Sequence, residues 1–536
     1  MRPTPVRDGC IARANVDVCF EQRSRASCCW RSIRGLLATL AILAAAGGCT
    51  SLRQWCRNGF KVGPNYAPPP APVSPAWIDS GRDGLTAAAV QDGQWWTTFD
   101  DPVLDRLIES ARVQNLDLRA AGTRVLVARA QRGVAVGNLF PQSQAALSAY
   151  AHGQISQNLG LPLPSQLNVW ADGFNASWEL DFWGRFRRNI EAANADLAAS
   201  VEDYGDTLVL LLAEVATRYV ELRTYEARLE FARRNVEIQR GSLKLAEDRH
   251  ATGRATELDV RQARSSLAQT EALIPPLEMG RRRASNQLCI LLGTPVTDLA
   301  AQLGTSPIPA ASVEMAIGLP ADLLVRRPDI RRAASQVAAQ SARIGVAEAD
   351  FYPRLAINGF IGYAARDLSD LFESRSFLSF VIPTLQWNVL NYGRILNNVR
   401  IEDARLQGAV LEYQQTVLTA GREVEDALIG FVQSQQQAAK LAASVEESQR
   451  FVELVIMQFD AGVTDFNRVF NAQSTLVTLQ DQLATSRGNI ALNLIQAYRA
   501  MGGGWESFAA GSITTACPRP VPQVSQQPQG AVVFQN

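Results

Sequence analysis

The sequence contains very little histidine and lysine, and its charges of the two signs cancel. Only His152 and His250 are present, in unrelated parts of the chain, which nearly excludes a histidine-based metal site. Of the 52 basic residues only Lys61, Lys244 and Lys440 are lysines, so 49 are arginines, which we interpret as genomic bias. With 52 acidic residues the net charge is zero, so no attraction to nucleic acid is implied.

Cysteine is scarce beyond the first 56 residues, where only Cys289 and Cys517 remain of the eight. A disulfide framework or a zinc cluster needs several spaced cysteines in the folded body, so neither is expected. The pair Cys28-Cys29 has the form of a redox or metal pair, but we favour the interpretation that its segment is discarded. The sequence also lacks a nucleophile elbow and a phosphate loop. We therefore expect no enzyme, no catalytic residue and no cofactor other than a covalent lipid.

The N-terminal region has the layout of a secretory signal. Arg31 and Arg34 precede the apolar run "GLLATLAILAAAGGCT" (35–50), which is too short to span a membrane. Cys49 follows Ala46-Gly47-Gly48, a pattern similar to a bacterial lipobox, although alanine replaces the usual leucine. We expect residues 1–48 to be a signal peptide that is removed, with Cys49 carrying the lipid. The length of residues 1–30 suggests that the start of the sequence is over-called. Ordinary cleavage nearby, with Cys49 an incidental thiol, is the alternative.

Two further terminal segments have biased composition. Residues 49–93 contain "KVGPNYAPPPAPVSPAW" (61–77), which predicts an extended, lipidated, Pro-rich leash. Residues 506–536 are rich in proline and glutamine, which predicts a disordered tail.

Self-comparison reveals a tandem repeat. Three glycines of the first half recur 209 residues later, in the pairs Gly184 and Gly393, Gly253 and Gly462, and Gly293 and Gly502. The prolines Pro141 and Pro353 differ by 212 positions. We therefore divide the body into two structural repeats, 94–318 and 319–505.

Each repeat is predicted to hold one very long helix and a return helix. Apolar or small residues recur at steps of three and four over 184–250 and 394–459, with no proline in either segment. At 1.5 Å per residue each helix would reach about 100 Å, a length that suits a rod or a tube. Gly253 and Gly462 can end these helices in the left-handed conformation. The return helices are expected at 257–292 and 465–501, the first broken or bent at Pro275-Pro276.

Before each long helix the pattern changes to that of a β-hairpin, over 140–182 and 353–391. In "NVWADGFNASWELDF" (168–182) apolar residues alternate with small or polar ones, as in a membrane-barrel strand. The run "SFLSFVIPTLQWNVL" (376–390) is less regular, and Pro383 is expected to interrupt it.

The prolines at 141 and 353 lie where a helix leads directly into a strand. Proline stops helical hydrogen bonding and favours an extended predecessor, so a tube of helices can continue into a barrel of strands. Two repeats supply only four strands, which cannot close a barrel, and open edges cannot lie in lipid. Several chains must therefore share a barrel; three would give twelve strands, although closure alone permits two or four chains.

Four further stretches of the sequence are distinctive: "VGPNYAPPPAP" (62–72), "WWTTFDDPVLDRLIESARVQNLDLRAA" (95–121), "SWELDFWGRFRRNIEAA" (177–193) and "LPADLLVRRPDIRRAASQVAAQSARIGVAEADFYPRLAINGFIG" (319–362). With them the chain resembles the TolC-like outer-membrane efflux factor family, in particular its NodT-type lipoprotein branch that works with RND pumps. The resemblance implies a mainly α chain with a membrane β-barrel part, assembled as a homotrimer with a twelve-stranded barrel above a periplasmic α-helical barrel. It further implies lipid anchoring in the outer membrane, export of drugs, metals or other toxic solutes, and docking to a periplasmic adaptor and an inner-membrane RND pump.

The resemblance also assigns candidate sites. The adaptor-docking tips would be Thr252-Gly253-Arg254 and Ala461-Gly462-Val463, of which only the glycines match the family firmly. A charged ring at the periplasmic aperture would involve Asp259, Asp465 and Arg468; a solvated helix face is the alternative. At the helix–barrel junction the candidates are Pro141, Gly184, Arg185, Pro353, Gly393 and Arg394, with ordinary surface arginines as the alternative for Arg185 and Arg394.

Two other functions stay open at this point. A non-porous periplasmic rod would use the long helices, but the alternating strands argue against it. A type I secretion duct paired with an ABC transporter would share the fold; the lipobox and the "VGPNY" segment favour the RND branch.

Overall fold

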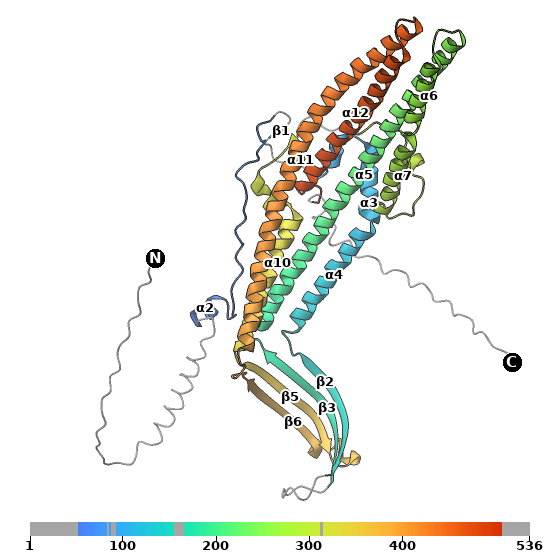
Figure 1. Cartoon of the computed structure of the whole chain (residues 1–536). Helices are drawn as coiled ribbons and strands as arrows, with labels where there is room; N and C mark the ends of the chain where they lie inside the picture. The colour runs from blue at the N-terminus through green and yellow to red at the C-terminus, as the bar shows by residue number, and fades with distance from the viewer. Residues whose placement is uncertain (1–51, 83–84, 87–92, 155–165, 311–314, 506–536) are drawn as a thin grey trace, which may run out of the picture.

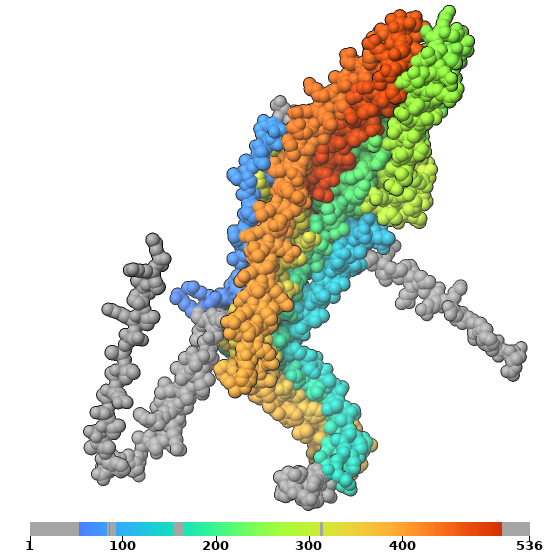
Figure 2. All heavy atoms as spheres, viewed as in Figure 1, coloured from blue at the N-terminus to red at the C-terminus, as the bar shows by residue number. Residues whose placement is uncertain are grey.

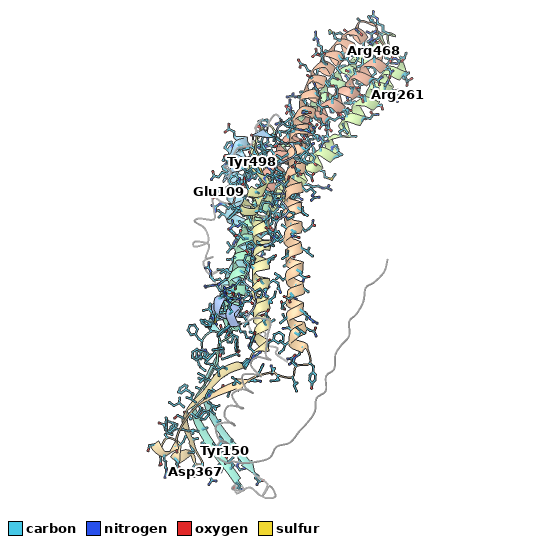
Figure 3. The ribbon with its side chains drawn as sticks, turned by 90° about the vertical axis from the view of Figure 1, so that its left-hand side faces the viewer. Glu109, Tyr150, Arg261, Asp367, Arg468 and Tyr498 are labelled. Carbon is cyan, nitrogen blue, oxygen red and sulfur yellow. The ribbon has the colours of Figure 1, made fainter. Side chains whose placement is uncertain are left out.

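The computed structural model describes residues 52–82, 85–86, 93–154, 166–310 and 315–505. The signal segment, Cys49 and the C-terminal tail lie outside these residues. The described chain is elongated, with a bundle of long helices at one end and a curved sheet at the other (Figures 1 and 2). In the side view, Arg261 and Arg468 mark the free end of the helices, Glu109 and Tyr498 the middle, and Tyr150 and Asp367 the sheet (Figure 3).

The two long helices are α5 (Arg185–Ala251) and α11 (Arg394–Asp460), each of 67 residues. Gly184 and Gly393 precede them with φ of 82° and 79°, in the left-handed region that glycine enters at little cost. No helix in the described part of the chain combines the length and the apolarity that a membrane crossing requires.

The return segments differ between the repeats. In the second repeat a single helix, α12 (Phe466–Ala500), returns along α11. In the first, α6 (Glu257–Glu271) ends before the proline pair and α7 (Ile274–Leu291) starts with those prolines in its first turn. A proline in the first turn lacks only an N–H that has no helical partner there, so the pair starts a new helix.

The other half of each long helix is covered by a helix that leads into the sheet. The helices α3 (Pro102–Gln114) and α4 (Leu116–Gly137) pack on α5, and α10 (Pro328–Glu348) packs between α5 and α11. Asp101 caps α3, because its carboxylate accepts hydrogen bonds from the backbone N–H groups of Val103 at 2.8 Å and Leu104 at 3.3 Å.

The main hydrophobic core lies at mid-height, where α3, α5, α7, α10, α11 and α12 meet. It is completed by short elements: η1 (Trp95–Phe99), α8 (Ala300–Leu303), η3 (Pro320–Asp322), α9 (Leu323–Arg326), and the two-residue strands β1 (Leu85–Thr86) and β4 (Met315–Ala316), which pair in parallel. A buried polar chain crosses this core. The Tyr219 hydroxyl donates to Asp101 at 2.7 Å, and Arg223 lies over the Tyr219 ring and donates to the Leu303 carbonyl at 2.7 Å. Burial, followed by the bond to Asp101, raises the pKa of Tyr219 to about 12.

The sheet contains four antiparallel strands in the order β2 (Ser143–Gln154), β3 (Gln166–Leu180), β5 (Arg354–Ala365) and β6 (Phe377–Gln386). The two predicted hairpins therefore lie side by side, and Phe174 of β3 stands opposite Ile361 of β5. Two short 3-10 turns, η5 (Leu368–Asp370) and η6 (Ser374–Ser376), connect β5 to β6.

The expectation that Pro383 interrupts its strand is wrong. β6 continues through it, and Pro383 pairs in register with Ile357. Proline lacks only the N–H, and β6 is the last strand of the sheet, so one side of its backbone has no strand partner among the described residues.

The predicted leash is extended, as its prolines indicate, but it does not hang free. Residues 59–78, which we call the strap, run from the sheet–helix junction to mid-height alongside α11 (Figures 1 and 2). At the upper end Trp77 is buried and donates to the Ile317 carbonyl at 3.2 Å, and the backbone N–H of Ile78 donates to Glu425 at 2.9 Å. These contacts could not be predicted from the proline-rich composition of the strap, because Trp77 and Ile78 form them and the prolines do not.

Candidate functional site

Among the described residues, two strand edges of the sheet have no partner, those of β2 and β6. Large apolar side chains of the sheet are exposed; Phe174 of β3 is 65% exposed and Val381 of β6 is 73% exposed. Unpaired backbone groups cannot remain in lipid, so a sheet with this apolar surface needs further strands to complete it.

At the junction between the helices and the sheet, α4 and α10 each lead into a strand through a proline. In the first repeat Pro141 lies between α4 and β2, and Trp178 of β3 donates to the Leu139 carbonyl at 3.1 Å. In the second, η4 (Ala349–Phe351) ends α10 before Pro353 and β5. Trp183 connects the repeats, because its Nε1 donates to the Pro353 carbonyl at 2.9 Å and its ring stacks on Tyr352.

The start of α5 is capped from the preceding strand. The Asp181 carboxylate accepts from the backbone N–H groups of Phe186 and Arg187, each at 3.0 Å, and from Arg187 Nε at 2.9 Å. Arg185 reaches back to Glu179 of β3 at 3.3 Å. At the matching position of the second repeat, the Arg394 backbone N–H donates to the Asn391 carbonyl at 2.9 Å.

The lower end of the strap is bound between the repeats, a feature that the sequence reasoning did not identify. Arg188 is 2% exposed; its Nε donates to the Val62 carbonyl and its terminal nitrogen to the Gly63 carbonyl, both at 2.9 Å. Gly63 packs on the backbone of Gly345 in α10. A possible signal was the run "RFRR" after Gly184, because two consecutive arginines at a helix start are electrostatically unfavourable unless they have partners.

The helix tips lie at the end farthest from the sheet (Figure 1). Thr252 caps α5, and Gly253 follows with φ of 72°, so that the Arg254 N–H donates back to the Arg249 carbonyl at 2.8 Å. The second tip has the same turn at Ala461-Gly462, where φ of Gly462 is 78° and the next residue, Val463, is 75% exposed.

Two contacts connect the tips within the chain. Arg249 donates to the Asp460 carbonyl, and its guanidinium lies 5.2 Å from the centre of the Phe459 ring. Gln262 of α6 donates to Asn467 of α12 at 3.0 Å. The two hairpins therefore present their tips as one unit.

Both predicted aperture acids cap a return helix. Asp259 forms a capping box with Thr256, in which the Asp259 carboxylate accepts a hydrogen bond from the Thr256 backbone N–H at 2.8 Å. Asp465 is the N-cap of α12 and accepts from the backbone N–H of Arg468 at 3.3 Å. Both carboxylates lie near the start of the return helix beyond a tip, where Asp465 is exposed and Asp259 is half-buried.

Carboxylates on α5 form ion pairs with α4 and α10. Burial alone would raise the pKa of Asp203, but hydrogen bonds from Arg124 and Arg332 outweigh it and hold that pKa below its usual range. For Glu202 burial dominates and raises the pKa, although Arg331 lies at 2.6 Å. These pairs fix the lateral positions of the three helices below mid-height.

Comparison with known proteins is consistent with this arrangement. Residues 107–294 and 319–503, one segment in each repeat, match the sequence model of the family described as "Outer membrane efflux protein".

Individual relatives match over almost their whole length. The chain is 30% identical over 494 residues to the toluene efflux pump outer membrane protein TtgF of Pseudomonas putida, covering 89% of this chain and 98% of that protein. It is 30% identical over 451 residues to the cation efflux system protein CusC of Escherichia coli, covering 84% and 96%. Among solved structures, the outer-membrane channel OprN superposes with a TM-score of 0.79 at 31% identity, covering 83% of this chain and 99% of that one.

Proposed function

The chain belongs to the outer membrane efflux protein family, and from this premise we propose that it assembles as a homotrimer that forms the exit channel of a three-part export pump. It is an outer-membrane component of an efflux system, with the helix-rich repeat fold of the outer-membrane channels.

The observation that carries the proposal is the four-stranded sheet with its two unpaired edges. Pairing β6 of one copy with β2 of the next would remove all edges, and three copies would give a barrel of twelve strands. The helices above the sheet would continue this ring as a tube through the periplasm. A monomeric rod would leave both edges and the apolar surface of the sheet without partners.

The proposed partners follow from the two ends of the molecule. At the sheet end, the lipid would be attached to Cys49, which lies outside the described residues. At the far end, the tips would dock a periplasmic adaptor that connects the channel to an inner-membrane RND pump, with Val463 as an apolar contact. The aperture would be narrowed by Asp259, Asp465 and Arg468, and the junction residues would hold the strands in line with the helices.

The exported solutes are proposed to be drugs, metal ions or other toxic small molecules. Relatives of similar identity are named for toluene efflux and for cation efflux, so the channel fold serves chemically different solutes. We infer that the pump selects the solute and the channel conducts it.

The assembly is tested by measuring the mass of the purified protein in detergent and its conductance in planar bilayers. We expect three copies per particle and discrete conductance steps. A particle of one copy, or a trimer that inserts without conducting, would contradict the channel proposal and favour the rod.

Docking at the tips is tested by cross-linking the channel to its adaptor in membranes. Val463→Glu should abolish the cross-link, because a charge would replace an exposed apolar contact. Val296→Glu, which changes an exposed valine in the α7–α8 connection away from the tips, is the matched control and should leave the cross-link unchanged.

A further inference from the structure

A short helix that precedes the strap, α2 (Leu52–Arg57), lies beside the junction between the long helices and the sheet (Figure 1). Its Trp55 ring packs against Phe60 at 4.8 Å, Phe182 at 5.4 Å and Trp183 at 5.5 Å between ring centres. Phe182 and Trp183 come directly after the end of β3 at Leu180. The helix therefore lies level with the end of the sheet that faces the long helices.

The chain after α2 is held firmly in an unusual conformation. Gly59 and Phe60 both have positive φ, of 66° and 62°, and for phenylalanine this conformation is strained. Arg187 stabilises the turn, because its two terminal nitrogens donate to the Gly59 carbonyl at 2.8 Å and to the Phe60 carbonyl at 2.9 Å. The turn leaves the Phe60 side chain 52% exposed.

The segment formed by α2 and the turn after it exposes both positive charge and aromatic surface. Arg53 and Arg57 lie one helical turn apart and are exposed, and neither forms an ion pair with any residue that the structure describes. The rings of Phe60 and Phe182, which pack on Trp55 of the same helix, are also exposed. Basic and aromatic residues together are typical of segments at the boundary between lipid headgroups and acyl chains.

We propose that α2 rests on the periplasmic surface of the outer membrane, where Arg53 and Arg57 bind phosphate groups of phospholipids and Phe60 contacts the acyl boundary. The inference rests on the proposed function, which places the sheet in the membrane. The covalent chain is compatible with it: Cys49, the proposed lipid site, precedes Leu52 by three residues, and three residues can span at most about 10 Å. The segment then acts as a rigid foot that sets the depth of the sheet in the bilayer.

The chain supplies its own reporter for this contact. Cys56 of α2 is exposed, whereas Cys289 is buried, so a Cys517→Ser variant with a lipidated Cys49 has Cys56 as its accessible thiol. A fluorophore on Cys56 of the full-length trimer would be studied in vesicles of phosphatidylethanolamine and phosphatidylglycerol. Lipids with a nitroxide on the headgroup should quench it strongly, and aqueous iodide should quench it less than in detergent. Iodide quenching as strong as in detergent, with no effect of nitroxide lipids, would overturn the proposal.

A charge reversal separates headgroup binding from mere tethering by the lipid. Arg53→Glu with Arg57→Glu should shift the helix toward water, lowering the ratio of nitroxide to iodide quenching on the order of tenfold. The matched control is Arg233→Glu with Arg234→Glu, an equal reversal on exposed residues of α5 far from the sheet, which should change nothing. Unchanged quenching in the first variant would refute the phosphate contact.

Conductance of the same vesicles distinguishes a failure of the membrane contact of α2 from a failure of the proposed channel function. If the trimers conduct but the probe on Cys56 is exposed to water, the foot is refuted and the channel stands. If the protein neither inserts nor conducts, the proposed function fails and the inference fails with it.

Discussion

Substitution of Gly345 by alanine should release the strap, although alanine normally favours a helix. Gly345 lies within α10, and a Cβ atom there would stand 2.8 Å from the Val62 carbonyl oxygen and 2.9 Å from both Cγ and Nε of Arg188. Atoms at these distances overlap, and the opposing groups are a backbone and a buried arginine with four polar partners, so neither can move away freely.

The magnitude follows from the bonds that the displaced strap would lose. Arg188 donates two charge-assisted hydrogen bonds to strap carbonyls, each worth about 1.5–3 kcal/mol. Alanine returns about 1 kcal/mol through its helix propensity. The net loss is about 2–5 kcal/mol, and since every 1.4 kcal/mol is a factor of ten, the released population should rise by about 30-fold to several thousand-fold.

A protease that cleaves only after lysine measures this population directly. The chain has three lysines: Lys244 and Lys440 lie inside α5 and α11, and Lys61 lies in the strap, paired with Glu191 and followed by the buried Val62. Cleavage after Lys61 should be slow in the native protein and faster in Gly345→Ala, because cleavage follows the open population when reclosing is fast.

The control for this experiment is Gly241→Ala, in α5, where a Cβ meets nothing within 4 Å. It should leave the cleavage rate at Lys61 unchanged. Equal rates in the native protein and in both variants would show that the Gly345 contact does not hold the strap, and the reasoning from steric overlap would be refuted.

Four further substitutions test the packing of the helices through the temperature at which heat dissociates the proposed trimer on a gel. Gly184→Ala should lower this temperature more than Gly393→Ala. Both glycines have positive φ, but a Cβ at 184 also overlaps the strap, whereas a Cβ at 393 meets only a side-chain nitrogen 3.7 Å away. Equal losses would contradict the strap contact. Tyr219→Phe should cost about 1–3 kcal/mol, because a buried oxygen of Asp101 loses its donor; an unchanged temperature would count against this bond. Burial raises the pKa of Asp206 in the folded state, so protonated Asp206 stabilises the fold below the unfolded-state pKa, and this stability is lost as the pH rises through the folded-state pKa. Asp206→Asn should therefore raise the dissociation temperature at pH 7 and leave it unchanged at pH 4. A rise at both pH values would refute the raised pKa.

Local patterns in the sequence were sufficient to locate the long elements. A seam of apolar residues predicts a helix wherever it is sustained, and a glycine with positive φ ends or starts one, so α5 and α11 begin at the residues that follow Gly184 and Gly393. The alternation in 168–182 likewise predicted β3. In each case the residues that determine the structure are adjacent in sequence.

Features that depend on distant contacts could not be predicted in this way. Pro383 was expected to interrupt its strand, but β6 tolerates it as an edge strand. Which strand lies at the edge depends on the strand order, which a local pattern does not give. The strap was interpreted as a leash because its contact with Arg188, more than a hundred residues later in the sequence, could not be inferred from its composition. For the aperture, the sequence placed Asp259 beyond the first tip, but its capping box with Thr256 emerged only from the geometry.

The strap also explains why three separated sequence motifs occur in one chain. "VGPNY" supplies Gly63, "FWGRFRR" supplies Gly184 and Arg188, and "IGVAEADFYP" supplies Gly345, and these residues meet at one point between the repeats. A Cβ at Gly63, Gly184 or Gly345 would overlap a neighbour in this site. At Gly393, the counterpart of Gly184, a Cβ would meet only Asn397. One strap therefore makes the two junctions of each chain unequal, and a trimer built from them has three anchored junctions that alternate with three unanchored ones.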